Sequence, residues 1–249
     1  MSEGLSRQEL IRYSRQLLLS EINEPEQLRL KHANVLIIGL GGLGSPAAFY
    51  LASSGIGKLT LMDDDKVELS NLQRQILYKI SHLGQDKCKA ASKTLAALNN
   101  HIDIQTVSQQ FNDQNGQALI AECDIVLDCS DNFTTRYLVN RLAKEYQKPL
   151  VSGAAMGFDG QLCIVDNRQK NAPCYECLFA KPLKAPKGNC DTLGVISPLL
   201  GVIGAQQALA TLQILLNTPD LPQFIQYNGK TLSQNAFNFV KSEHCSVCN

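Results

Sequence analysis

The feature that most constrains the fold of this chain is the stretch of residues 34–65, NVLIIGLGGLGSPAAFYLASSGIGKLTLMDDD. An apolar run over residues 35–38 predicts a buried strand, and a glycine-rich turn, a helix and a second strand follow it. Gly39, Gly41 and Gly44 have the Gly-x-Gly-x-x-Gly spacing, which permits a tight turn and brings the backbone close to a phosphate at the helix N-terminus. The stretch therefore predicts a βαβ unit that binds a nucleotide.

Gly42 extends this turn to GxGGxG, and three aspartates close the second strand. Asp63 stands 19 positions beyond Gly44, where an acidic side chain accepts hydrogen bonds from ribose hydroxyls, and Asp65 is a further candidate contact in the same run. The spacing alone does not distinguish NAD or FAD from ATP, and some turns of this kind bind no ligand.

The rest of the chain alternates predicted strands and helices, which favours an α/β fold: a Rossmann-like, doubly wound, mostly parallel sheet with helices on both faces. Ser6 and Glu9 form a capping box at the start of the first helix, and Asn228-Gly229 indicates a C-terminal antiparallel hairpin. Predicted helices cover residues 6–19, 24–31, 84–98, 116–121, 132–146 and about 198–216, and further strands cover 102–107, 124–128, 149–152, 160–165, 223–227 and 232–240.

The length of 249 residues fits one domain. We expect an N-terminal helical segment (1–33), a nucleotide-binding core (34–166) and a C-terminal part (167–249) with a proline-rich loop, an apolar helix and the hairpin. Hydrophobic residues at 44% and charged residues at 18% supply an ample core.

Lysine plus arginine and aspartate plus glutamate balance at 23 each, so the overall charge points to neither nucleic acid nor a membrane surface. The N-terminus lacks the pattern of a signal peptide. Residues 194–216 come nearest to the run of about 18 apolar residues that a membrane span needs, but polar residues and glycines interrupt them. We expect a cytoplasmic protein.

Charged residues beyond the second strand bear on which nucleotide is bound. An enzyme that cleaves ATP must neutralise a triphosphate, and Arg74 in SNLQRQ and Lys87 in GQDK supply cations for that purpose. Taken singly, both are ordinary solvated surface residues. Asp131, in the DCSDN that follows a predicted strand, is placed either to reach a metal-bound phosphate or to cap the next helix.

Nine cysteines include two Cys-x-x-Cys pairs, Cys174 with Cys177 and Cys245 with Cys248. An odd number without a secretion signal argues against a disulfide framework and favours metal binding or thiol chemistry.

Taken together, the motifs resemble, in order and spacing, the ubiquitin-activating-like adenylyltransferases of the MoeB/ThiF group. They are RYSRQ near the N-terminus, the GxGGLG turn, the aspartate run, SNLQRQ, GQxK, DCSDN and the two cysteine pairs, and they extend from about Arg12 to Cys248. Members of this group adenylate the C-terminal glycine of a small ubiquitin-fold sulfur carrier and release pyrophosphate.

The resemblance assigns roles to the matching positions. It implies that the glycine turn holds the ATP phosphates, that Asp63 binds the ribose, and that Arg74 and Lys87 stabilise the triphosphate. Asp131 is then a Mg²⁺ ligand. Two further implied roles are polar contacts from Asn71 and Gln75, and Arg15 reaching into the ATP site of a second subunit.

The implied reaction agrees with these residue types. A carboxylate and a triphosphate repel each other, so the site must compensate charge and align the reactants. The attacking carboxylate is already ionised at neutral pH, so no general base is required.

The resemblance also implies that the four paired cysteines form a tetrahedral zinc site. Because all four positions are filled by protein, such a metal is structural. The gap of 67 residues between Cys177 and Cys245 means that the fold must bring the two pairs together. Two unrelated reduced pairs are the alternative.

Cys190 lies in an Asn-Cys-x-Thr context that the thiamin branch of the group links with sulfur transfer; the alternative is an uncommitted loop cysteine.

The carrier is MoaD-like or ThiS-like, for molybdopterin or thiamin synthesis, and the residues do not decide between them. With no rhodanese-like extension after Cys248, we expect a separate sulfur donor. The implied role of Arg15 in a second subunit and the apolar residues 194–216 predict a homodimer.

Two other functions remain open at this point. The first is an NAD-dependent dehydrogenase built on the same turn, although the sequence offers no clear substrate domain or catalytic histidine. The second is a non-catalytic zinc scaffold that binds a ubiquitin-fold partner without turnover.

Overall fold

The computed structural model describes residues 4–181, 194–218 and 220–248. In them, one eight-stranded sheet has the order β3-β2-β1-β4-β5-β6-β7-β8. The strands are β1 (Asn34–Ile38), β2 (Lys58–Met62), β3 (Asp103–Val107), β4 (Ile125–Asp128), β5 (Leu150–Met156), β6 (Asp159–Val165), β7 (Phe224–Asn228) and β8 (Ser233–Phe237).

The strands from β3 to β5 are parallel, and β6, β7 and β8 extend the sheet in antiparallel register. The chain passes from β1 outward to β2 and β3, then returns to place β4 on the other side of β1. In such sheets a crevice opens at the carboxyl ends of the strands where the winding direction reverses. The fold therefore places a ligand crevice between β1 and β4.

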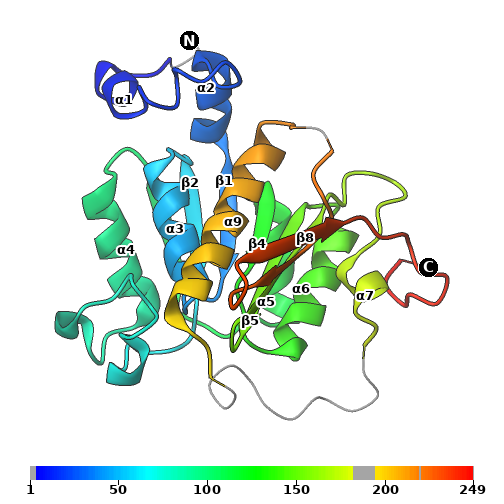
Figure 1. Cartoon of the computed structure of the whole chain (residues 1–249). Helices are drawn as coiled ribbons and strands as arrows, with labels where there is room; N and C mark the ends of the chain where they lie inside the picture. The colour runs from blue at the N-terminus through cyan, green and yellow to red at the C-terminus, as the bar shows by residue number, and fades with distance from the viewer. Residues whose placement is uncertain (1–3, 182–193, 219, 249) are drawn as a thin grey trace.

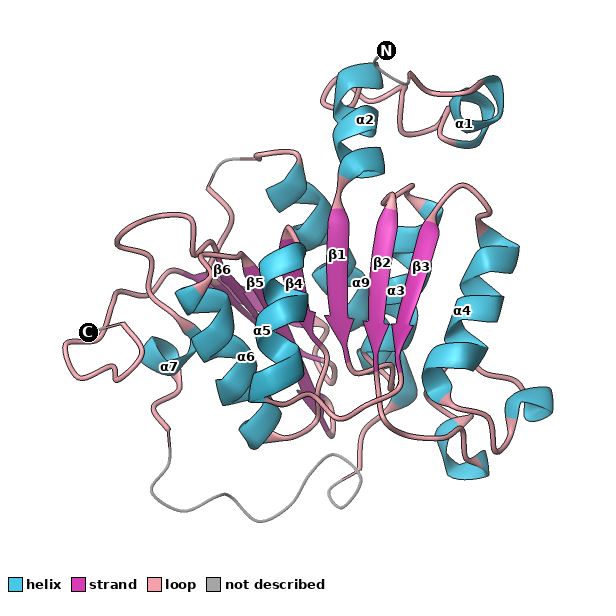
Figure 2. Cartoon of the chain, turned by 180° about the vertical axis from the view of Figure 1, so that it is seen from behind, coloured by secondary structure: helices cyan, strands magenta, loops and turns pink. Residues whose placement is uncertain are grey.

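Helices cover both faces of the sheet, as Figures 1 and 2 show from opposite sides. One face carries α3 (Gly44–Ser53), α4 (Lys87–Leu98) and α9 (Ser197–Leu215), which bury alternate residues of the central strands such as Val35 and Ile37. The other carries α5 (Asp113–Glu122) and α6 (Phe133–Glu145) against Leu36 and Ile38. The predicted α/β fold class is confirmed.

The helix α9 is long and apolar enough to cross a membrane by length and composition alone, with a mean hydropathy of 1.3. We did not expect any segment to meet that criterion. In this fold it packs against α3 and the strands β4, β5 and β6, and half of it is buried. These contacts are those of a core helix.

The N-terminal segment differs from its prediction. The Ser6–Glu9 capping box is present, but α1 (Arg7–Arg12) ends well before residue 19. The chain turns because Tyr13 inserts into the body of the protein, where its hydroxyl accepts a hydrogen bond of 2.9 Å from Asn99. Together with α2 (Glu24–His32), this segment lies at the amino ends of the parallel strands (Figure 2).

Candidate functional site: a phosphate-binding turn and a four-cysteine cluster

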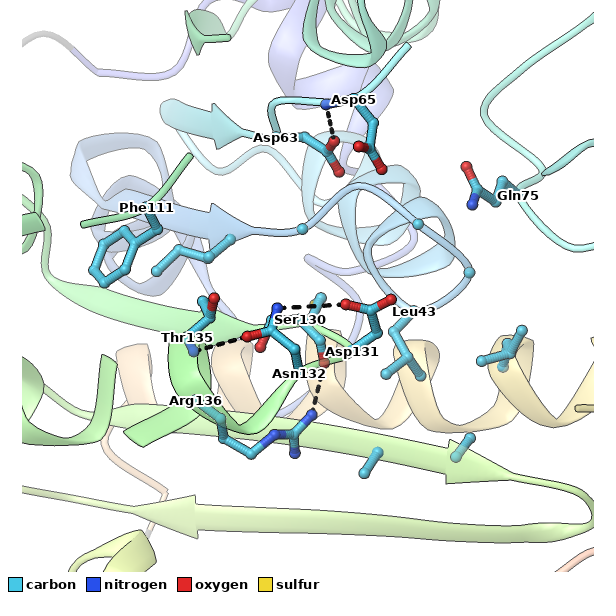
Figure 3. Close-up of a pocket in the computed structure, with 18 of the residues that line it drawn as sticks. Leu43, Asp63, Asp65, Gln75, Phe111, Ser130, Asp131, Asn132, Thr135 and Arg136 are labelled. Atoms are coloured by element: carbon cyan, nitrogen blue, oxygen red, sulfur yellow. Dashed lines mark hydrogen bonds between the residues drawn. The ribbon is translucent and has the colours of Figure 1, made fainter. Parts of the chain in front are cut away.

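A cavity of about 740 Å³ opens at the carboxyl ends of β1, β2 and β4, with residues of β5 and β6 along one side (Figure 3). Its volume is within the range of small-molecule sites. Ten of the predicted site residues line it: Gly39, Gly41, Gly42, Asp63, Asp65, Asn71, Arg74, Gln75, Lys87 and Asp131. Residues that are far apart in the sequence therefore meet in one crevice.

At some positions of the turn the fold requires glycine, whereas at one position it leaves room for a side chain. Gly39 has a φ of +89°, and a Cβ atom on Gly44 would lie 2.0 Å from the carbonyl oxygen of Gly39. Gly44 does not line the cavity itself; it permits the close packing beneath the turn. At Gly41 an added Cβ would meet only Gln75, at 3.6 Å, so its surface faces open space where a phosphate can approach.

Asp63 and Lys87 form a buried charged group at the end of β2. The Oδ2 atom of Asp63 accepts a hydrogen bond from the Leu40 backbone N–H at 2.7 Å, and its Oδ1 accepts one from the Asp65 backbone N–H at 2.9 Å. The Lys87 Nζ atom lies 2.7 Å from the Asp65 carboxylate and 3.9 Å from that of Asp63. Burial raises the pKa of Asp63, against the lowering effect of Lys87 and the two N–H donors.

Three residues after β2 present polar groups to the cavity. Asn71 is buried, and its Oδ1 atom accepts a hydrogen bond from the Glu68 backbone N–H at 3.1 Å. Arg74 donates to the carbonyl oxygen of Ser70 at 2.9 Å. The Oε1 atom of Gln75 is buried without a hydrogen-bond partner. Such an atom is costly unless a ligand supplies a donor, so its position favours ligand binding here.

The structure decides between the two interpretations of Asp131. Asn132 is the N-cap of α6, because its Oδ1 atom accepts a hydrogen bond from the Thr135 backbone N–H at 2.9 Å. Asp131 is exposed at the cavity and takes no part in capping (Figure 3). Its carboxylate is therefore available to a ligand or a metal ion.

Sequence reasoning missed a buried network beneath this turn. Asp128 is fully buried at the end of β4, and its Oδ1 atom accepts hydrogen bonds from the backbone N–H and the hydroxyl of Ser130, at 3.0 and 2.5 Å. Its Oδ2 atom accepts one from the Ser152 hydroxyl at 2.7 Å and lies 3.6 Å from Nε of Arg136. A charged pair of this kind gives no local sequence signal, since its members belong to a strand and a helix.

Two predicted residues lie away from the cavity described here. Arg15 is exposed on the N-terminal segment, which lies at the opposite edge of the sheet (Figure 2). It therefore does not reach the cavity of its own chain. Cys190 lies outside the described residues.

The two cysteine pairs meet although Cys174 and Cys245 are 71 positions apart. Cys174 is the N-cap of the short helix α7 (Tyr175–Leu178) and Cys177 lies within it, and the C-terminal tail lies beside this helix in both views (Figures 1 and 2). The Sγ atom of Cys174 lies 4.0 Å from the Sγ atom of Cys177 and 3.5 Å from that of Cys245. The Sγ atoms of Cys177 and Cys248 are 3.6 Å apart.

A tetrahedral zinc ion with Zn–S bonds of about 2.3 Å holds its sulfur atoms roughly 3.8 Å apart. The four thiols fit that geometry, and all eight described cysteines are free of disulfides. Asn140 donates to Cys174 Sγ at 3.5 Å, and a hydrogen bond of this kind orients a metal-binding side chain. The cluster therefore suits a structural zinc ion.

Fold and site together define a doubly wound α/β protein with a phosphate-binding turn in its crevice and a four-cysteine cluster at its side. The profile of the ThiF family matches residues 13–248. The chain belongs to the ThiF family.

Among curated relatives, the chain is 42% identical over 252 residues to "Adenylyltransferase and sulfurtransferase MOCS3" of Anopheles gambiae, covering 98% of this chain and 56% of the relative. It is 42% identical over 249 residues to the protein of the same name from Drosophila ananassae, covering 98% and 54%. The chain thus spans about half the length of these relatives.

Among solved structures, the chain resembles E. coli MccB with ATP, with a TM-score of 0.78 and 25% identity over 96% of this chain and 73% of that one. The structure of E. coli MccB with MccA-N7isoASN gives a TM-score of 0.81 and 25% identity, covering 96% and 75%.

Proposed function

We propose that this chain is an adenylyltransferase that joins AMP from ATP to the C-terminal glycine of a small ubiquitin-fold sulfur carrier ending in Gly-Gly. The observation that carries the proposal is the meeting, in one cavity, of the glycine turn, the cations Arg74 and Lys87, and the exposed carboxylate of Asp131. Membership in the ThiF family, the names of the curated relatives and the likeness to a structure with ATP support it.

In the proposed reaction a carrier carboxylate oxygen attacks the α-phosphorus of ATP, the bond to the β-phosphate oxygen breaks, and pyrophosphate leaves. Arg74 and Lys87 compensate the charge on the triphosphate, while the turn at Gly41 fixes the phosphates. Asp63 accepts hydrogen bonds from the ribose hydroxyls through the remaining lone pairs of its oxygens. Asn71 and Gln75 add polar contacts.

Two metal ions belong to this proposal. Mg²⁺, held through Asp131, neutralises part of the phosphate charge when it is bound. Zinc at Cys174, Cys177, Cys245 and Cys248 has a structural role.

The acyl-adenylate must be consumed by a sulfur nucleophile, for which we propose a separate sulfur donor. Among the described cysteines, only Cys129 lines the cavity, and burial raises the pKa of its thiol and disfavours the reactive thiolate. A part for Cys190 in sulfur transfer remains a proposal. We further propose that the protein is a cytoplasmic homodimer in which Arg15 serves the partner's site.

Carrier-dependent exchange of labelled pyrophosphate into ATP tests this function. We expect exchange with either a MoaD-like or a ThiS-like carrier, and the active one identifies the pathway. Removal of the carrier's terminal glycine should abolish exchange. Absence of exchange with both intact carriers would contradict the proposal. Full activity of an Arg74→Ala variant would favour a role without catalysis.

A further inference from the structure

Arg136 joins the turn that carries Asp131 to the neighbouring strand. Its Nη2 atom donates to the carbonyl oxygens of Ser130 and Gly153, at 2.7 and 2.9 Å, and its Nη1 atom donates to the Ser152 hydroxyl at 3.1 Å. Figure 3 shows the guanidinium beneath the Ser130–Asp131 turn. Since Ser130 directly precedes Asp131, the position of the guanidinium sets the position of that turn.

The guanidinium is itself held by a residue of the cysteine cluster. The ring centroid of Tyr175 lies 5.7 Å from Cζ of Arg136, within the distance of a cation–π contact. Both side chains are buried, where such a contact is stronger than at the surface. Tyr175 stands between Cys174 and Cys177, so any movement of the first cysteine pair moves the ring.

A second connection runs along α6. Asn140 is fully buried one helical turn beyond Arg136. Its Oδ1 atom accepts a hydrogen bond of 2.8 Å from the Tyr175 backbone N–H, and its Nδ2 atom donates to Cys174 Sγ at 3.5 Å. One helix therefore contacts the cysteine cluster and the nucleotide-side turn through residues four positions apart.

We propose that Arg136 is a positioning residue for Asp131, and that Tyr175 and Asn140 couple the four-cysteine cluster to metal-nucleotide binding in the cavity. The inference rests on the proposed function only in taking Asp131 as the ligand of the Mg²⁺ that accompanies ATP. An ordered cluster holds the ring of Tyr175 against Arg136, which holds the turn. When the cluster is displaced, the Tyr175 ring and the turn are no longer held in place. The coupling is reciprocal, because linkage makes each site affect the other equally.

The test measures how much Mg²⁺ is needed for a fluorescent ATP analogue to bind the zinc-loaded protein. We expect Tyr175→Leu and Asn140→Ala to raise the half-saturating Mg²⁺ concentration about five-fold, the size that loss of such a contact predicts. Tyr175 lines the cavity, but Asn140 does not, so an effect of Asn140→Ala is indirect and passes through its contacts with Tyr175, Cys174 or α6.

Phe224→Leu is the matched control. Phe224 is a buried aromatic residue of the same apolar cluster, in edge-to-face contact with Phe179 and Phe237 rather than with Arg136. It should destabilise the fold and leave the Mg²⁺ requirement within two-fold of wild type. The same half-saturating Mg²⁺ concentration in all three variants would overturn the proposal.

The reciprocal measurement follows the equilibrium partition of zinc between the protein and a competing colorimetric chelator, with and without ATP and Mg²⁺. We expect bound nucleotide to raise the zinc affinity of the wild-type protein and to have less effect in Tyr175→Leu; the same zinc affinity with and without nucleotide in the wild type would overturn the coupling. Neither measurement needs a carrier. If coupling is present but no carrier supports pyrophosphate exchange, the proposed function is wrong and the coupling stands. If the wild-type chain binds no ATP, both the proposed function and the coupling are wrong.

Discussion

The Asp63 carboxylate is held in the folded protein at a position that disfavours its charge. Its side chain is 8% exposed, and burial raises its pKa above the ordinary value of 3.8. The folded chain therefore binds this proton more tightly than the unfolded chain does. Ionised Asp63 lowers stability at neutral pH, and we interpret it as a group kept for ligand binding.

The upward shift of the Asp63 pKa determines how the stability of the protein changes with pH. Relative to an Asp63→Asn variant, which cannot titrate, the wild-type free energy of unfolding should fall as the pH rises from about 4 through the folded-state pKa and then level off. Urea unfolding of both proteins over this range measures the difference. A difference that grows in favour of the wild type with rising pH would contradict the assignment.

Asp131 and Asn132 are neighbours with separable roles. We expect Asp131→Asn to reduce pyrophosphate exchange by about 100-fold or more, while changing stability by less than about 0.5 kcal/mol because the side chain is exposed and caps nothing. Asn132→Ala should lower the free energy of unfolding by about 1 kcal/mol through loss of the N-cap. Comparable destabilisation by both changes would mean that Asp131 supports the fold.

At the scale of elements, the phosphate-binding turn can be dissected glycine by glycine. Gly41→Ala should leave the melting temperature almost unchanged and weaken ATP binding, because the added methyl enters the open space of the cavity. Gly44→Ala should lower the melting temperature, since its methyl collides with the Gly39 carbonyl. Differential scanning fluorimetry and ATP titration distinguish the two outcomes; equal stability of both variants would contradict this division.

The sequence predicted the type of most elements and some of their ends. Local signals sufficed for the capping box at Ser6 and the helix after the glycine turn. They failed where a distant residue intervened, as at Tyr13, whose burial ends α1 early. The hairpin of β7 and β8 was expected at Asn228-Gly229, but Asn228 pairs with Ser233 as the last residue of its strand, and residues 229–232 form the loop.

At the scale of the whole molecule, the cysteine cluster fastens the C-terminal tail to α7. Removal of zinc with a chelator should lower the melting temperature by about 5 °C or more, because the metal holds two distant segments together in the folded state alone. Restoring zinc should restore the melting temperature. An unchanged melting curve after verified zinc loss would contradict a structural role.

Arg15 tests whether the site needs two chains. Arg15→Ala and Lys87→Ala should each abolish pyrophosphate exchange, but an equal mixture of the two inactive variants should regain about a quarter of wild-type activity, because half of the dimers are mixed and each has one intact site. Absence of any recovery after subunit exchange would contradict a role for Arg15 in the partner's site.

By itself, the sequence determined what depends on neighbours along the chain: the βαβ turn at residues 39–44, the acidic end of β2 and the two cysteine pairs. The spacing of these residues is a property of one or two consecutive elements. Only the tertiary structure decided that Asp131 faces the cavity while Asn132 caps α6, that Arg136 supports the turn, and that Tyr175 links Arg136 to the cysteines. Those pairings depend on how separate strands and helices converge at the carboxyl edge of the sheet.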